Sequence, residues 1–340
     1  MRDREENVKQ KKKIMPEFKD IYKEYFDLIQ NKLFEIAENT KPNSMKEPFV
    51  YLIENGGKRL RPILTMLSAG AVNGNPLDAI NSGVSLEIMH NFTLVHDDIM
   101  DSSPLRRGKE TIHTKWDNSV AILLGDLMLG IALQLLMQDA KHQNFINLQE
   151  VFNDSLVVVC EGQALDVEYN IKQDINVDDY LDMISKKTGN LIKASVLMGC
   201  YIGNANDKEI KLLEEFSYSL GLAFQIQDDY LDLTSDDTGK IIGQDIVEGK
   251  KTFMIIRSKE LAESKEDKEL INKFYQNNGL QRDEIQNMLN LITKLGVLDE
   301  AKDKFESYYQ NAYDSINKLE QNEYTTMIKE LVKLTKNRKF

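Results

Sequence analysis

The chain has 340 residues, 41% of them hydrophobic and 29% charged, as expected of a globular protein with a large core. Its 43 basic and 55 acidic residues give a net charge of −12, which argues against nucleic acid or an anionic membrane as the main partner. The two cysteines, Cys160 and Cys200, exclude a disulfide scaffold and fit the reducing cytoplasm. Met1–Lys13 is charged, without the apolar stretch of a signal peptide.

The placement of proline predicts a helical protein. All six prolines lie at or before Pro104, and long segments without proline favour helices, whose interiors proline disrupts. Apolar residues such as Phe18, Ile21 and Tyr25 recur every three or four positions, and no alternating run bounded by hairpin turns predicts a sheet. We therefore predict an all-α fold. The expected helices cover residues 16–38, 44–54, 60–72, 77–98, 117–139, 144–169, 177–202 and 206–235, with several more between about 250 and 336.

The chain is expected to form one domain. Loops are predicted at residues 39–43, 73–76, 102–108 and 235–249, and none of them has the composition of a flexible linker. We assign residues 16–340 to a single large domain and residues 1–15 to a loose N-terminal tail.

Residues 120–137, VAILLGDLMLGIALQLLM, are nearly long and apolar enough to span a membrane. Asp126 lies near the centre of this segment, where a carboxylate costs about 2.5–3.5 kcal/mol on insertion. Gly125, Gly130 and Gln134 weaken the segment further. We predict a helix buried in the middle of the protein and no membrane span.

Two acidic clusters share the pattern Asp-Asp-x-x-Asp. The first contains Asp97, Asp98 and Asp101, and the second contains Asp228, Asp229 and Asp232. Each follows an apolar helix, and positions i and i+4 share a helix face, so like charges there are unfavourable unless a cation offsets them. Carboxylates of this kind suit Mg²⁺, which keeps several waters and binds substrate phosphates. One cluster alone could be a solvated helix end, whereas two predict a clamp for a magnesium-bound diphosphate.

Basic residues that could bind phosphate lie close to these clusters. In GGKRLRP, at residues 56–62, Lys58 and Arg61 are three apart and could hold one anion together. Arg106 and Arg107 follow the first acidic cluster, and the planar fork of arginine grips phosphate oxygens. Either pair alone could equally form surface salt bridges, but their positions favour phosphate binding.

The histidines allow a competing interpretation. His90 lies seven residues before Asp97, on almost the same helix face, where a lone histidine is more often structural. A metal-dependent phosphohydrolase would use His90, His96 and His113 as ligands. That interpretation leaves the second acidic cluster and the arginine pair unexplained, so it is the weaker one.

These motifs, in this order, resemble the trans-isoprenyl diphosphate synthases, the family of farnesyl and geranylgeranyl diphosphate synthases. The resemblance extends from about residue 45 to 255. It rests on GGKRLRP, LVHDDIMD, LRRG, the Gly125-Asp126 pair, GQALD at 162–166, KTG at 187–189, FQIQDDYLD, TGK at 238–240 and residues 245–250. It implies an all-α type I isoprenoid synthase fold around a deep central cavity, usually in a homodimer. It also implies that an allylic diphosphate ionises, the carbocation alkylates isopentenyl diphosphate, and a proton is lost.

The resemblance also implies a role for each matching residue. Three Mg²⁺ ions would be held by the six aspartates, with Asp97, Asp101 and Asp228 as direct ligands. The residues that would hold the allylic diphosphate are Arg106, Lys187, Lys240 and Lys250. Those that would hold isopentenyl diphosphate are Lys58, Arg61, His90 and Arg107. Thr188 and Gln225 would stabilise the carbocation with their oxygen dipoles, and Gln163 and Asp166 would line the cavity. The released diphosphate would take the proton, so we name no side-chain base.

Product length is expected to depend on the residues below the first acidic cluster. Phe92 lies about 7.5 Å below Asp97 along the helix axis, and in the family a bulky residue there commonly forms the cavity floor. Thr93 is small, and the first cluster lacks the two-residue insertion of many bacterial farnesyl synthases. Both features favour a C20 product, with C15 close behind. Ideal geometry, however, turns Phe92 about 140° away from Asp97, which leaves an ordinary core aromatic as the alternative.

Two other functions stay open. A class I terpene cyclase usually replaces the second Asp-Asp-x-x-Asp with an Asn/Ser/Glu-type triad and lacks GGKRLRP. A non-catalytic partner subunit of a two-component prenyl synthase typically loses one or both acidic clusters. Both motifs are present here, which favours an active synthase.

Overall fold

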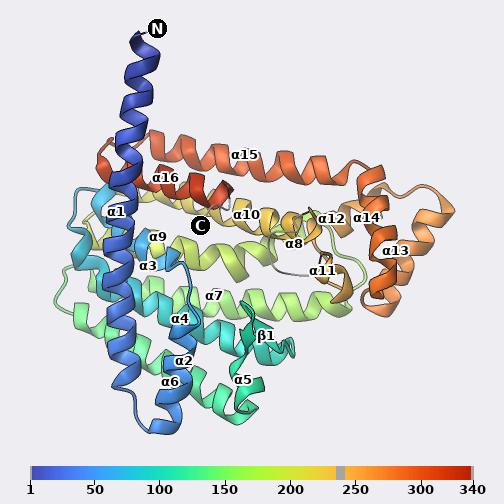
Figure 1. The fold of residues 1–340 in the computed structure, drawn as a ribbon, viewed down its shortest axis with the longest axis horizontal. Helices are drawn as coiled ribbons and strands as arrows, with labels where there is room; N and C mark the ends of the chain where they lie inside the picture. The colour runs from blue at the N-terminus through green and yellow to red at the C-terminus, as the bar shows by residue number, and fades with distance from the viewer. Residues whose placement is uncertain (1, 235–241, 338–340) are drawn as a thin grey trace.

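The computed structural model describes residues 2–234 and 242–337, and their side chains from residue 18 onward. Its described backbone is helical almost throughout (Figure 1), which confirms the predicted all-α class. The elements of the first half are α1 (Arg2–Glu38), α2 (Asn43–Glu54), α3 (Leu60–Ala71), η1 (Pro76–Ala79), α4 (Ile80–Met100), β1 (Leu105–Arg106), β2 (Lys109–Glu110), α5 (Ile112–Lys115), α6 (Asn118–Leu136), η2 (Met137–Asp139) and α7 (Phe145–Ile171).

The second half continues in the same manner. Its elements are α8 (Val177–Ile184), η3 (Ser185–Gly189), α9 (Asn190–Ile202), α10 (Asp207–Thr234), α11 (Gln244–Val247), α12 (Phe253–Leu261), α13 (Lys265–Asn277), η5 (Arg282–Glu284), α14 (Ile285–Lys294), α15 (Val297–Asn317) and α16 (Glu323–Asn337). The first helix begins at Arg2, earlier than the sequence predicts, and the domain boundary at residue 15 stays a prediction.

Polar side chains cap several of these helices. Asp117 accepts a hydrogen bond from the backbone N–H of Val120 at 2.8 Å, which marks the start of α6. The Asn176 side chain accepts a hydrogen bond from the backbone N–H of Asp179 at 2.9 Å, which marks the start of α8. Each such bond satisfies a backbone donor that the first helical turn leaves unpaired, typically contributing about 1 kcal/mol.

The long helices pack side by side in layers (Figure 1), with α15 on α10, α10 on α9, α9 on α7, and α4 on α6. Leu86, Ile88 and Met89 of α4 are fully buried, as are Phe216 and Leu222 of α10. Burial of each such side chain contributes about 1.5–3 kcal/mol. This packing fixes the two helices that carry the acidic clusters.

The helix predicted at 177–202 is interrupted, because residues 185–189 form a π-helical turn, η3, between α8 and α9. Helices α7 and α10 both pack closely against the backbone of this turn. A Cβ at Gly162 of α7 would lie 2.3 Å from the backbone N of Lys187, and one at Gly221 of α10 would lie 2.6 Å from the Cα of Gly189. The missing side chains therefore allow α7 and α10 to approach the turn closely. Turns of this kind are frequent at functional sites.

A short hairpin of β1 and β2 begins inside the predicted loop at 102–108 and ends just beyond it, at Glu110. Its two turn residues, Arg107 and Gly108, have φ of 53° and 76°, as in the tight turns that match strand twist. The Tyr51 hydroxyl of α2 donates to the Glu110 carbonyl at 3.0 Å. The Tyr51 ring in turn contacts Trp116 edge-on, with ring centroids 5.3 Å apart. These contacts hold the hairpin against α2.

Helix α6 differs from the prediction of a helix buried in the middle of the protein. Among the described residues, only the helical segment 118–139 is long and apolar enough to cross a membrane. Its most apolar stretch of 18 residues has a mean hydropathy of 2.2, and 39% of that stretch is buried. One face packs on α4, while Ile122 and Leu123 are exposed. By length and composition alone this is weak evidence for a span, since core helices of soluble proteins share these features.

Candidate active site

The first acidic cluster (Asp97, Asp98, Asp101) lies at the C-terminal end of α4, and the second (Asp228, Asp229, Asp232) lies near the end of α10. Two lysines connect them. Lys187 of the π turn and Lys250 line one cavity together with the second cluster, and both form ion pairs with the first. The two clusters, 131 positions apart in sequence by their first members (228 − 97), therefore border one site.

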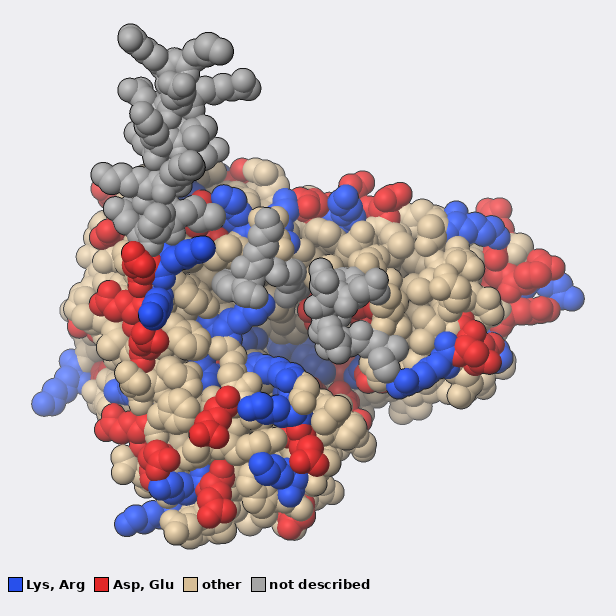
Figure 2. Space-filling model, in the orientation of Figure 1, with Lys and Arg blue, Asp and Glu red and all other residues tan. Residues whose placement is uncertain are grey.

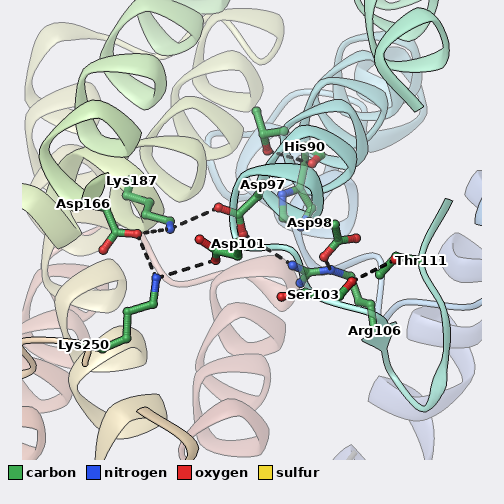
Figure 3. Close-up of polar contacts among 11 residues, drawn as sticks. His90, Asp97, Asp98, Asp101, Ser103, Arg106, Thr111, Asp166, Lys187 and Lys250 are labelled. Carbon is green, nitrogen blue, oxygen red and sulfur yellow. Dashed lines mark hydrogen bonds and ion pairs between the residues drawn. The ribbon is translucent and has the colours of Figure 1, made fainter. Parts of the chain in front are cut away.

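The lysines converge on Asp166 of α7, as Figure 3 shows. The Nζ atoms of Lys187 and Lys250 lie 2.7 and 3.3 Å from the same Oδ2 atom of Asp166. Lys187 also lies 3.3 Å from Asp97, and Lys250 lies 3.6 Å from Asp101. Burial opposes ionisation of Asp166, but the two lysines outweigh it and lower the pKa of that carboxyl. The site is thus a set of alternating charges before any ligand binds.

Arg106 of the hairpin reaches the first cluster from the other side (Figure 3). Its Nε lies 2.7 Å from Asp98 and one of its terminal nitrogens lies 3.4 Å from Asp97. Burial raises the pKa of Asp98, although the charge of Arg106 opposes the rise. Arg107 instead donates a hydrogen bond to the Gly56 carbonyl and so joins the hairpin to the GGKRLRP loop.

The second cluster is connected to the π turn by hydrogen bonds. Asp229 accepts from the Tyr180 hydroxyl at 2.6 Å and from the Gln225 amide at 2.8 Å. Gln225 in turn accepts from the Thr188 hydroxyl at 2.8 Å. Burial raises the pKa of Asp229 to about 7, with its two hydrogen-bond donors opposing the rise. The chain of bonds fixes the orientation of the Gln225 amide, so that its oxygen points to Thr188.

Two cavities meet at Lys187 and Thr188. The polar cavity, of about 240 Å³, contains the second cluster, Asp166 and Lys250. The apolar cavity, of about 170 Å³, is lined by Arg61, His90, Phe92, Thr93, Leu94, His96, Asp97, Met100, Val159, Cys160, Gln163 and Leu191 in addition to the two shared residues. Phe92 and Asp97 thus line the same cavity, although ideal helix geometry predicts that their side chains point about 140° apart.

The residues predicted to bind a second anion lie beside the apolar cavity. Arg61 and His90 both line it, and Nε of Arg61 is buried with no hydrogen-bond partner among the described residues. Burial and the charge of Arg61 lower the pKa of His90 well below its usual value, so the imidazole is neutral near pH 7. Lys58 is exposed at the rim of the loop. Lys240 lies outside the described residues.

Basic side chains gather in and around a hollow near the centre of the face drawn in Figure 2. On a chain with a net charge of −12, this local excess of positive charge marks a place where an anion is stabilised. The charge pattern therefore agrees with the two candidate anion sites.

Residues 42–292 match the family model described as polyprenyl synthetase. The chain belongs to this family. A geranylgeranyl diphosphate synthase of Sulfolobus acidocaldarius is 38% identical over 303 residues, which cover 87% of this chain and 91% of that protein. A short chain isoprenyl diphosphate synthase of Methanothermobacter thermautotrophicus is 38% identical, covering 76% of this chain and 80% of that protein. A crystal structure of geranylgeranyl pyrophosphate synthetase from Pyrococcus horikoshii superimposes with a TM-score of 0.88 at 34% identity, covering 95% and 99% of the two chains.

These comparisons confirm the predicted family resemblance and the type I isoprenoid synthase fold. They also confirm that this polyprenyl synthetase is a prenyltransferase. The phosphohydrolase interpretation has no support from them. The geometry also disfavours it, because the His96 imidazole is turned toward α6, with its Nε2 3.3 Å from the Ile122 carbonyl. His113 contacts the Thr111 hydroxyl at 3.1 Å.

The donor chemistry of this polyprenyl synthetase fits magnesium, although no described group of three or more His, Cys, Asp or Glu side chains is close enough to hold a metal unaided. Each acidic cluster offers carboxylate oxygens, which are hard donors. Mg²⁺ needs only one or two carboxylates when phosphates and waters complete its shell. These aspartates therefore suit Mg²⁺ ions whose remaining ligands are substrate phosphates and waters.

Sequence reasoning missed two features of this site. Tyr180 lies 49 residues before its partner Asp229, and no local pattern indicates the contact. Arg59 lies within GGKRLRP, yet it is fully buried and pairs with the buried Glu87 at 3.0 Å. Its left-handed backbone, with φ of 49°, turns it inward between Lys58 and Arg61. An unusual backbone conformation of this kind has no signature in residue type alone.

Proposed function

We propose that this prenyltransferase condenses isopentenyl diphosphate with an allylic diphosphate (dimethylallyl, geranyl or farnesyl) and releases geranylgeranyl diphosphate (C20) or farnesyl diphosphate (C15). The observation that carries the proposal is the pair of lysines, Lys187 and Lys250, which stand between two acidic clusters. Lys187 also lines the adjoining apolar cavity. A charged head group and an apolar tail would each have a matching surface. The names of the relatives support this substrate class.

The allylic diphosphate would lie at the polar end of the site. Arg106, Lys187 and Lys250 would bind its oxygens, in place of the ion pairs they now make with aspartates. The six aspartates would hold three Mg²⁺ ions, which when bound would offset the charge that develops on the leaving diphosphate. The bond between the allylic carbon and the diphosphate oxygen breaks, and the electron pair leaves with the diphosphate.

The carbocation would form next to Thr188 and Gln225, whose oxygens carry partial negative charge. Because Gln225 donates its amide hydrogen to Asp229, its carbonyl oxygen stays on the side of Thr188 and the cavity. The alkene of isopentenyl diphosphate then attacks the cation, a carbon–carbon bond forms, and the released diphosphate takes the proton that is lost. Fixed dipoles of this kind need no reorganisation during the reaction.

Isopentenyl diphosphate would be bound by Lys58, Arg61, His90 and Arg107. Within the part of the chain that the structure describes, Nε of Arg61 makes no hydrogen bond, so it can donate to the substrate. The neutral His90 can donate one hydrogen bond without adding charge. Both side chains line the apolar cavity together with Asp97 and Lys187, which would place the five-carbon substrate next to the cation.

The decisive test is product analysis of the purified chain with Mg²⁺, isopentenyl diphosphate and each of the three allylic primers. We expect linear C15 or C20 alcohols after removal of the phosphates, and no product when a chelator removes the metal. If no primer is extended, the catalytic proposal is wrong and the non-catalytic partner subunit becomes the favoured function. A cyclic product would instead favour the terpene cyclase.

Phe92→Ala is expected to lengthen the main product by at least one isoprene unit. The Phe92 ring is 9% exposed and lines the apolar cavity, so its removal extends the space open to the growing tail. Chromatography of the alcohols from wild type and variant measures the change. Phe34→Ala is the control, because that half-buried side chain of α1 lines neither of the two cavities. An unchanged product distribution in Phe92→Ala would refute the floor role.

We also propose a cytoplasmic homodimer. Among the described residues, eight large apolar side chains on or next to α6 and α7 are exposed, an unusual number for a free surface. They are Ile122, Leu123, Leu133, Met137, Ile146, Val157, Val167 and Ile171. A second copy of the chain would cover this face. Localisation can be checked by fractionation of cells that express the protein.

Leu123→Glu is expected to convert the dimer into a monomer, because it places a charge within the proposed apolar interface. The Leu123 side chain is 58% exposed, so the substitution disturbs little within one protomer. Light scattering after gel filtration measures the mass. Leu77→Glu, at a position on η1 that is 49% exposed, should leave the dimer intact. A wild-type chain that elutes as a monomer would overturn the proposal.

A further inference from the structure

His96 precedes the first acidic cluster and lies between the apolar cavity and α6. Its imidazole packs edge-on against Phe92, with ring centroids 4.8 Å apart and an interplanar angle of 70°. The two residues are four apart on α4 and therefore share a helix face. Both line the apolar cavity. His96 thus supports the ring that is proposed to form the floor.

The opposite side of the imidazole faces Gly125 of α6. A Cβ at Gly125 would lie 2.3 Å from Nε2 and 2.6 Å from Cδ2 of His96, distances that side-chain carbons do not adopt. Nε2 of His96 is also 3.3 Å from the Ile122 carbonyl, one turn earlier on α6. The absent side chain of Gly125 therefore creates the space that the imidazole occupies. The imidazole therefore lies between the Phe92 ring and Gly125 of α6.

We propose that Gly125 and His96 together set the depth of the apolar cavity and so the length of the product. His96 is then a specificity-determining residue of the cavity wall. Bulk added at position 125 must push the imidazole away from α6, toward Phe92 and the growing tail. Removal of the imidazole has the opposite effect, because it opens the space behind Phe92. The inference deepens the proposed prenyl chain elongation and rests on it.

The test compares two glycines on the same helix. Gly125→Ala is expected to shorten the main product by one isoprene unit. Gly130→Ala, on α6 as well, is the matched control, because a Cβ there would have no atom of a described residue within 4 Å. Both substitutions gain the same intrinsic helix propensity, so only their steric surroundings differ. The ratio of products also does not depend on how much enzyme is folded.

A double-mutant cycle separates the proposed pair from a general loosening of the helix contact. His96→Ala is expected to lengthen the main product by one isoprene unit. In the variant that combines His96→Ala with Gly125→Ala, the new methyl group has no imidazole to displace, so the product should match that of His96→Ala alone.

Three results would overturn the inference: equal products from Gly125→Ala and Gly130→Ala, no lengthening in His96→Ala, or a double variant with a shorter product than His96→Ala. If Gly125→Ala does not fold, His96→Ala alone decides. A wild-type enzyme that makes no prenyl diphosphate would reject the proposed function itself, which is a different outcome from a product whose length does not respond.

Discussion

Asp97→Asn is expected to lower kcat by about 10²–10³-fold, the range typical for loss of one group that stabilises developing charge. Asparagine has nearly the same shape but carries no charge. Asp97 contacts both Lys187 and Arg106, so it sits where the proposed metal ions and the two cations meet. The loss should appear in kcat more than in KM, because the charge it acts on develops as the allylic bond breaks.

Steady-state kinetics at saturating Mg²⁺ measure this effect. Asp283→Asn is the control, since that aspartate is exposed on η5, within the described C-terminal part. Partial recovery of Asp97→Asn at higher Mg²⁺ would support a ligand role. Wild-type turnover in Asp97→Asn would contradict the assignment of the first acidic cluster.

Arg61→Gln is expected to raise the KM for isopentenyl diphosphate about 10²-fold, with little change in the KM for the allylic substrate. Hydrogen bonds to charged groups are worth about 1.5–3 kcal/mol, and about 2.7 kcal/mol corresponds to that factor. Burial lowers the pKa of Arg61 to about 10, with the charge of Glu87 opposing, so the guanidinium stays charged at pH 7. Glu87 itself pairs with Arg59, which leaves Arg61 available to an incoming anion.

The split between the two KM values distinguishes a specific anion site from general damage to the fold. Arg282→Gln, at an exposed position of η5, should leave both values unchanged. Equal increases in both KM values would contradict a dedicated site.

The helical class and the six aspartates could be predicted from the sequence, because helix periodicity and the Asp-Asp-x-x-Asp spacing are local properties. The π turn at 185–189 could not, since it accompanies close approaches at Gly162 and Gly221 that only the packed structure brings about. The inward turn of Arg59 and the Tyr180–Asp229 bond likewise depend on tertiary contacts. The exposed face of α6 was missed for a related reason, because hydropathy does not distinguish a core from an uncovered surface.

The contact between Trp116 and Tyr51 gives this protein an internal optical probe. Trp116 is the single tryptophan of the chain, so the long-wavelength part of its intrinsic fluorescence arises at one known place. The indole contacts the ring of Tyr51, and the Tyr51 hydroxyl hydrogen-bonds to the hairpin that carries Arg106 and Arg107. Movement of the hairpin when a diphosphate binds would alter the surroundings of the indole. Emission spectra could therefore follow ligand binding in the unlabelled, unmodified enzyme.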